Sequence, residues 1–146
     1  MPLISPPSYL LKWIFLLATV RTTHSTVQRR DTIILTNGAG HIHSPNYPND
    51  YPPNTDQWWI VAASSGQRIR IHLSEFVLER FHDLLQFYDG SSHGNPVAEI
   101  TGQCTKEQPV ECLDSDVTTD HNIVHIRFFS DYSNQYRGFN LSYSVV

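Results

Sequence analysis

The chain has 146 residues, of which 40% are hydrophobic and 12% aromatic, and its formal net charge is −4. This length allows one domain of ordinary size, and the composition indicates a single buried core rather than disorder. Four of the 10 basic residues and none of the 14 acidic residues precede position 31, so residues 31–146 keep 6 basic and 14 acidic side chains, a formal net charge of −8. Nucleic-acid-binding proteins need a stripe of basic side chains, which a domain this acidic lacks, so we exclude that class of protein. The negative charge instead favours cations or basic proteins as binding partners.

The N-terminus is predicted to carry an export signal. Residues 9–20, YLLKWIFLLATV, form an apolar run interrupted only by Lys12. A membrane-spanning helix needs about 20 apolar residues, so the run predicts a cleaved signal peptide over residues 1–25 rather than a membrane anchor. Residues 26–34 form a short N-terminal segment in which Arg29-Arg30 is either a dibasic processing site or solvated charge. No second apolar run follows, so we expect a secreted, extracellular product without a membrane span.

Turn residues divide the rest of the chain into short strands. Four prolines within residues 45–53 exclude a helix there, and Asp89-Gly90 ends a later strand. Residues 67–73 alternate between apolar and polar side chains, as a half-buried strand does. The side chains expected to face the core from these segments are Ile69, Ile71, Leu73, Phe76 and Leu78. Leu85 and Phe87 mark the strand that Asp89-Gly90 ends.

The clearest strand pattern lies within residues 122–139, NIVHIRFFSDYSNQYRGF. Its inward residues are Val124, Ile126 and Phe128, and its outward residues are Ile123, His125 and Arg127. Strict period-two alternation suits a sheet with one face on a core and the other mostly wet. With no helical repeat elsewhere, the sequence predicts an all-β fold, an antiparallel β-sandwich.

The order and spacing of these motifs resemble a CUB domain. The matching pieces are Gly40-x-Ile42-x-Ser44-Pro45-Asn46-Tyr47-Pro48, Trp59-x-Val61, Ile69-x-Ile71-x-Leu73, Leu78-Glu79, Asp83-x-Leu85-x-Phe87-x-Asp89-Gly90, Asn122-x-Val124-x-Ile126-x-Phe128-x-Ser130-Asp131 and Gly138-Phe139-x-x-x-Tyr143. The resemblance covers about Leu35 to Tyr143 and implies a CUB domain over residues 35–146. It implies a compact, jelly-roll-like sandwich of secreted proteins that binds proteins or glycans and is not itself catalytic.

The cysteines depart from the family pattern. The resemblance implies four cysteines in two bridges, but Asp31, Gln57 and Arg80 stand at three of those places and only Cys104 lies near the fourth. An oxidising compartment and an even count favour a local bridge from Cys104 to Cys112, with two free thiols or an intermolecular bond as the alternatives. Closing so short a loop stabilises a domain by roughly 2.5 kcal/mol at most. The core must therefore contribute more than in other members.

The resemblance also implies a Ca2+ site. The three matching acids are Glu79, Asp83 and Asp131. Calcium needs six to eight oxygen ligands, and carboxylates with backbone carbonyls or waters supply them. Ser133 and Asn134 follow the third acid and could add oxygens. Tyr47 resembles the tyrosine that supports a ligand carboxylate in the family. The alternative is three solvated acids on separate loops.

Other motifs indicate less. His41 and His43 share one face of an extended segment, but no Cys or His cluster completes a zinc site. No G-x-S-x-G, H-E-x-x-H or P-loop pattern occurs, so we do not expect an enzyme. Asn140-Leu141-Ser142 is an N-glycosylation sequon, and strand alternation should leave Asn140 exposed.

These observations predict a secreted, calcium-binding CUB module that binds an extracellular protein or glycan. The family resemblance implies that a partner's Lys or Arg approaches the carboxylates that also hold the ion. One alternative is a structural component of an extracellular or mineralised matrix. A further alternative is a fragment of a larger protease or receptor, which would require sequence beyond Val146.

Overall fold

The computed structural model describes residues 32–105 and 116–146. Within these ranges the chain forms strands and no helix. The strands are β1 (Thr32–Leu35), β2 (Ala39–His43), β3 (Asp56–Ala62), β4 (Ile69–Val77), β5 (Leu84–Asp89), β6 (Ala98–Ile100), β7 (Gln103–Cys104), β8 (Asp116–Thr118), β9 (Ile123–Phe129) and β10 (Gly138–Val145).

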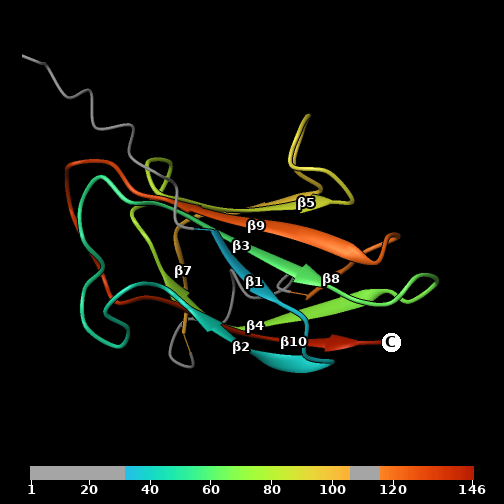
Figure 1. Cartoon of the computed structure of the whole chain (residues 1–146). Helices are drawn as coiled ribbons and strands as arrows, with labels where there is room; N and C mark the ends of the chain where they lie inside the picture. The colour runs from blue at the N-terminus through green and yellow to red at the C-terminus, as the bar shows by residue number, and fades with distance from the viewer. Residues whose placement is uncertain (1–31, 106–115) are drawn as a thin grey trace, which may run out of the picture.

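The strands form two sheets that pack face to face (Figure 1). The first sheet has the order β1-β3-β9-β5-β6, and the second has the order β2-β10-β4-β7 with β8 also paired to β4. Among the described residues, every strand pair is antiparallel except β1 with β3, which run parallel. The predicted antiparallel β-sandwich is confirmed, with this one parallel strand at an edge.

The strand register brings three connections to the same end of the sandwich. In the first sheet the start of β3, the end of β9 and the start of β5 lie side by side. In the second sheet the end of β2, the start of β10 and the end of β4 do the same. Residues 44–55, 78–83 and 130–137 therefore emerge together, at the left of Figure 1. The polar residues that follow separate strands in the sequence become neighbours there.

Aromatic rings join the two sheets inside the core. Phe128 of β9 and Phe139 of β10 are fully buried and meet edge to face, with ring centroids 5.4 Å apart. The ring centroids of Trp59 and Phe139 lie 5.9 Å apart, and those of Tyr51 and Phe128 lie 5.0 Å apart. The inward residues expected from the alternation are all buried, with 3% exposure or less. The period-two patterns therefore identified the core correctly.

A glycine fixes the end of the sandwich where the three connections meet. Gly138 has a φ of +85°, and a Cβ at this position would lie 1.8 Å from the Ser44 Oγ atom. Ser44 is fully buried, and its Oγ accepts a hydrogen bond from the Phe139 N–H at 3.1 Å. The absence of a side chain at position 138 thus lets the residue after β2 bond to the start of β10.

The outer face of the first sheet is less exposed to solvent than the alternation suggested. The Arg127 guanidinium forms two hydrogen bonds to Asp56, at 2.7 and 3.1 Å, and lies 5.5 Å from the Trp58 ring and 5.3 Å from the Phe129 ring. His125 is half-buried beside it. Burial lowers the pKa of His125, although a hydrogen bond to the Gly90 backbone partly opposes this effect.

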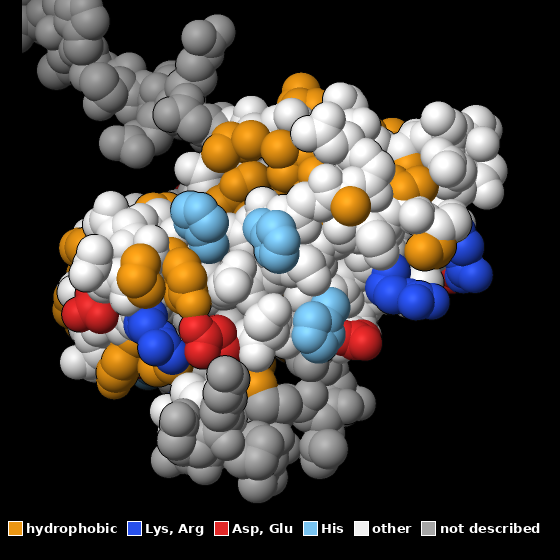
Figure 2. Space-filling view, turned by 90° about the horizontal axis from the view of Figure 1, so that it is seen from below, with side chains coloured by type: hydrophobic (Ala, Val, Ile, Leu, Met, Phe, Trp, Pro, Cys, Tyr) orange, Lys and Arg blue, Asp and Glu red, His pale blue; other side chains and the backbone are white. Residues whose placement is uncertain are grey.

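The second sheet presents histidines, uncharged polar side chains and a few charged side chains on its outer face (Figure 2). His41 and His43 lie on one face of β2, as the sequence suggested, and both are exposed. Asn140 lies between His43 of β2 and Glu75 of β4 in the register. It is partly exposed, while Phe139 and Leu141 on either side of it are fully buried. Its outward position agrees with the alternation, and glycosylation there stays a prediction.

Truncating a bridging ring should destabilise the whole sandwich. We expect Phe139→Ala to lower the free energy of unfolding by about 3–5 kcal/mol, because it removes buried area and leaves a cavity between the sheets. The matched control is Val97→Ala at a side chain that is 58% exposed, which should change stability little. Urea unfolding followed by tryptophan fluorescence measures both; similar midpoints for the two variants would contradict this assignment of the core.

His125 should make stability depend on pH. Because its pKa is lowered in the fold, the unfolded chain takes up a proton first as the pH falls below about 6.5, so stability decreases with acidification through that window. His125→Gln keeps a side-chain donor for the Gly90 carbonyl but cannot titrate. We expect a shallower loss of stability between pH 7 and pH 5 in urea unfolding of this variant, and an unchanged slope would refute the prediction.

Candidate functional site

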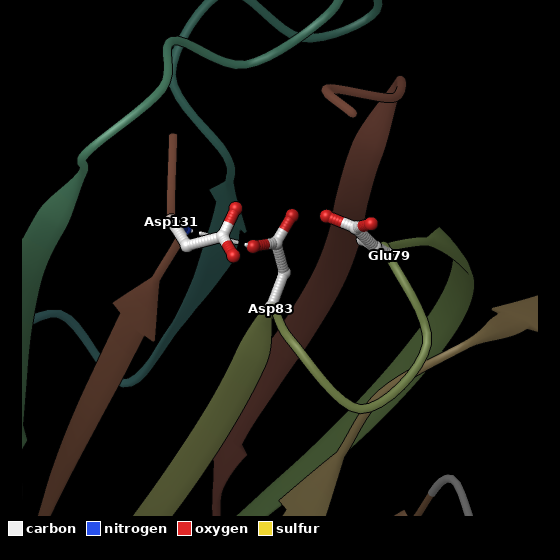
Figure 3. A group of neighbouring side chains, drawn as sticks. All are labelled: Glu79, Asp83 and Asp131. Atoms are coloured by element: carbon white, nitrogen blue, oxygen red, sulfur yellow. Dashed lines mark hydrogen bonds between the residues drawn. The ribbon is translucent and has the colours of Figure 1, made fainter. Parts of the chain in front are cut away.

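Three carboxylates meet where the connections converge. Glu79 and Asp83 lie on the β4–β5 connection, and Asp131 follows the end of β9. One carboxylate oxygen from each lies within 4.8 Å of the others. Figure 3 shows Glu79 and Asp131 pointing from opposite sides toward Asp83. The fold therefore brings together the three acids that the sequence singled out.

Asp83 is the buried member of this acidic cluster. Asp83 is fully buried, whereas Glu79 and Asp131 are partly exposed. The Tyr51 hydroxyl donates to Asp83 Oδ2 at 2.5 Å, and the Asp131 backbone N–H donates to Asp83 Oδ1 at 2.9 Å. Both carboxylate oxygens of Asp83 thus accept a hydrogen bond. One donor belongs to the β2–β3 connection and the other to the β9–β10 connection.

The electrostatics of the cluster favour a cation. Burial raises the pKa of Asp83, and the negative charges of Asp131 and Glu79 raise it further, while the two hydrogen bonds lower it. Burial also raises the pKa of Tyr51, as does its hydrogen bond to Asp83, so this hydroxyl keeps its proton and acts as a donor. Three carboxylates this close repel one another, and a positive ion between them would relieve both the repulsion and the cost of burial.

The segment after Asp131 closes the cluster. The Ser133 N–H donates to Asp131 Oδ1 at 2.7 Å, and Ser133 Oγ lies 3.0 Å from the same oxygen and 3.2 Å from Glu79 Oε2. Asn134 has a φ of +45°, and its Nδ2 donates to Glu79 Oε1 at 2.5 Å. The structure thus places both predicted auxiliary residues against the acids, where they act as hydrogen-bond donors.

The supporting tyrosine is Tyr51, not Tyr47. The Tyr47 hydroxyl bonds to Glu75, which also pairs with Arg137 at 3.1 Å, so Tyr47 serves a different acid. The Tyr51 hydroxyl bonds to Asp83 and also accepts the Glu79 N–H at 3.2 Å. Both tyrosines precede a proline in the same segment. Local sequence could not distinguish them, because the choice depends on which ring enters the core.

Sequence reasoning also missed His82. Its Nδ1 lies 3.7 Å from Asp131 Oδ2, and its side chain is largely exposed. Only the fold reveals this contact, since His82 belongs to the β4–β5 connection and Asp131 to the β9–β10 connection. A histidine here adds a ring nitrogen at the rim of the acidic cluster.

Only one cysteine of the predicted disulfide, Cys104, lies within the described residues. Cys104 is 2% exposed in β7, opposite Phe76 of β4. Cys112 lies outside the described residues, as does the predicted signal peptide. The Cys104–Cys112 bridge and the signal peptide stay predictions.

The donor set suits a hard cation. Among the described residues, the one group of three or more His, Cys, Asp or Glu side chains with converging ligand atoms is Glu79, Asp83 and Asp131. Carboxylate oxygens are the ligands that Ca2+ prefers, and a flexible coordination of six to eight oxygens tolerates a site completed by hydroxyl, amide or water oxygens. Zinc normally takes nitrogen or sulfur ligands, which the cluster does not offer.

The family comparison agrees with this fold. The CUB domain model matches residues 30–143. The chain therefore belongs to the CUB domain family, and the resemblance seen in the sequence is confirmed.

Relatives carry this domain within longer chains. The chain is 36% identical over 104 residues to rat (Rattus norvegicus) cubilin, an alignment that covers 71% of this chain and 3% of cubilin. It is 36% identical over 109 residues to bone morphogenetic protein 1 of Xenopus laevis, covering 72% of this chain and 14% of that protein. The chain thus spans a small part of the curated relatives it matches.

Solved structures share the sandwich. The full extracellular region of zebrafish Gpr126/Adgrg6 superposes with a TM-score of 0.65 at 30% identity, covering 79% of this chain and 14% of that one. The MASP-1 CUB2 domain bound to Ca2+ superposes with a TM-score of 0.63 at 24% identity, covering 77% of this chain and 96% of that one.

Across residues 32–105 and 116–146, no helix is long and apolar enough to cross a membrane.

The different places of the two tyrosines can be tested by removing each hydroxyl. We expect Tyr51→Phe to lower the free energy of unfolding by about 1–3 kcal/mol, because it takes a donor from the buried Asp83 and an acceptor from the Glu79 N–H. Tyr47→Phe should cost less, since Glu75 keeps Arg137 and contact with water. Urea unfolding in the presence of a chelator compares them, and equal losses would contradict the assignment.

Proposed function

We propose that this CUB domain is a secreted binding module in which Ca2+, held by Glu79, Asp83 and Asp131, prepares an acidic surface for a basic side chain of an extracellular partner. The observation that carries the proposal is the convergence of three carboxylates within 4.8 Å around one fully buried acid. A buried carboxylate that stays ionised needs a positive partner. The two groups that hold Asp83, the Tyr51 hydroxyl and the Asp131 N–H, are uncharged donors.

The surrounding residues fit calcium. The three carboxylates would supply the charged oxygens, and Ser133 and Asn134 are already in contact with them. Each would turn from donor to ligand by presenting its hydroxyl or amide oxygen to the ion. Tyr51 would keep its bond to Asp83 and orient that carboxylate from behind. The Ca2+-bound MASP-1 CUB2 domain, which has the same fold, supports this choice of ion.

Charge explains how the loaded site would recognise a partner. Three carboxylates exceed the charge of one Ca2+ by one unit, so the loaded site would remain negative. Ion binding would hold the carboxylates in place, and a Lys or Arg of the partner would then bind without having to order them. The acidic balance of residues 31–146 would further attract a basic partner.

Calcium binding is tested directly by calorimetry. We expect the wild-type chain to bind Ca2+ with a Kd of about 10⁻⁴ to 10⁻³ M, the range of extracellular calcium modules, and chelator to lower its thermal stability. Asp131→Ala removes a charged ligand and should abolish the calcium heat. The matched control is Asp116→Ala, which removes an equal charge from an exposed side chain at the start of β8 and should bind calcium normally.

Two results would refute the proposal. One is an absence of calcium heat in the wild-type chain. The other is identical heat in wild type and Asp131→Ala while the protein remains folded, which circular dichroism would establish. Loss of calcium heat in both Asp131→Ala and Asp116→Ala would show that general charge, rather than the acidic cluster, holds the ion.

A further inference from the structure

Three histidines share the outer face of the second sheet. His41 and His43 of β2 and His72 of β4 are all exposed there, among the histidines seen in Figure 2. Ser142 of β10 pairs with His41 on one side and with His72 on the other. The two histidines thus flank one serine in a single row across the sheet. The sequence pattern showed only the pair on β2, because His72 belongs to a strand that joins this face only in the fold.

The spacing within the sheet suits chelation of one ion by these three side chains. Neighbouring strands lie about 4.8 Å apart, so the Cα atoms of His41 and His72 are separated by about 10 Å. Residues two apart on one strand face the same side at about 7 Å, so His43 stands next to His41. The side chain of Ser142 between the rings is small and partly exposed, which leaves room above the sheet for them to converge.

An acidic side chain orients the His72 ring. The His72 Nδ1 atom lies 2.6 Å from Asp116 Oδ1, and Asp116 is paired with His72 from β8. An ionised carboxylate only accepts hydrogen bonds, so Nδ1 carries the proton. The two nitrogens lie on opposite sides of an imidazole, so Nε2 faces away from β8, toward the side of β4 on which β10 and β2 lie. A metal-binding histidine is usually held in this way, with one nitrogen bonded to a carboxylate and the other directed at the ion.

A backbone carbonyl holds the His43 ring in a similar way. The His43 Nδ1 atom lies 3.2 Å from the Ser44 carbonyl oxygen, and the ring stacks on Tyr47 with centroids 6.0 Å apart. A carbonyl oxygen only accepts, so the proton again belongs on Nδ1 and the lone pair on Nε2. Backbone carbonyls are the other common partners of metal-bound histidines. Two of the three rings are therefore held in the tautomer that binds a metal through Nε2.

We propose that His41, His43 and His72 bind a divalent transition-metal ion, Zn2+, on the outer face of the second sheet. Imidazole nitrogen is a preferred ligand of Zn2+, and three protein ligands leave a fourth tetrahedral position to water or to a group of a partner. The three nitrogens do not converge in the present conformation, but the rings are exposed and need only change rotamer to do so. The site shares no residue with the acidic cluster and does not rest on the proposed function.

Histidine-ring ¹⁵N NMR identifies the ligands directly. Zn2+ is titrated into the secreted chain, prepared without a polyhistidine tag, with Ca2+ in excess so that zinc does not report on the acidic cluster. We expect the Nε2 resonances of His41, His43 and His72 to shift on zinc binding. Those of His93 and His121, which lie outside this sheet, should stay in place.

Calorimetry on matched variants measures the zinc affinity. His72→Gln removes the ligand on β4 and should weaken zinc binding by more than about tenfold, while Asp116→Ala removes only the group that orients His72 and should weaken it by about tenfold. The control is His93→Gln, at an exposed histidine on the connection between β5 and β6, which should bind zinc as the wild type does. Asp131→Ala should also keep the wild-type zinc affinity, because it alters only the acidic cluster.

Three outcomes would overturn this inference. The first is an absence of zinc heat in the wild-type chain. The second is a zinc affinity that His72→Gln leaves unchanged, or ring shifts confined to His93 and His121. The third is an equal loss of affinity in His72→Gln and His93→Gln, which would show binding to surface histidines in general. Loss of zinc binding in Asp131→Ala would assign the ion to the acidic cluster and overturn it as well.

Discussion

The hydrogen bond between the Tyr51 hydroxyl and Asp83 connects the core of this domain to its acidic end. The Tyr51 ring is 1% exposed and packs against Phe128, while its hydroxyl holds a carboxylate that is itself fully buried. Because Phe128 meets Phe139 across the two sheets, the same set of contacts runs from one sheet through the core to the site. The position of the buried acid is therefore set by core packing rather than by the flexibility of a surface loop.

Burial of the Asp83 carboxylate lowers the stability of the ion-free domain, but it prepares a site at which a cation would bind favourably. The fold raises the pKa of this acid by taking it out of water and placing two other acids beside it. Hydrogen bonds from Tyr51 and from the Asp131 backbone offset part of that cost. What remains is a destabilisation that a divalent ion would remove, so ion binding and the order of this end of the sandwich should be coupled.

Non-covalent contacts occupy two of the places at which the CUB resemblance leads one to expect cysteine. Gln57 donates from its side chain to the Trp58 carbonyl, and the Arg80 guanidinium lies 5.8 Å from the Phe81 ring. Neither contact closes a loop covalently, so neither restricts the unfolded chain as a disulfide would. The edge-to-face aromatic contacts of the core and the tight junction of Gly138 with Ser44 then carry more of the stability.

The sequence by itself identified the longer central strands, their inward faces and the three acids, but not the short strands β1, β6, β7 and β8. Alternation at residues 69–73 and 123–128 is a local property, since successive side chains of any strand point to opposite faces. The resemblance to the CUB family, rather than any local pattern, pointed to Glu79, Asp83 and Asp131. The choice of Tyr51 over Tyr47, the contact of His82 with Asp131 and the parallel pairing of β1 were decided only by the tertiary structure. Each depends on which segments pack together across distances of tens of residues, and nothing local distinguishes one tyrosine before proline from another until one ring fills the space beside Phe128.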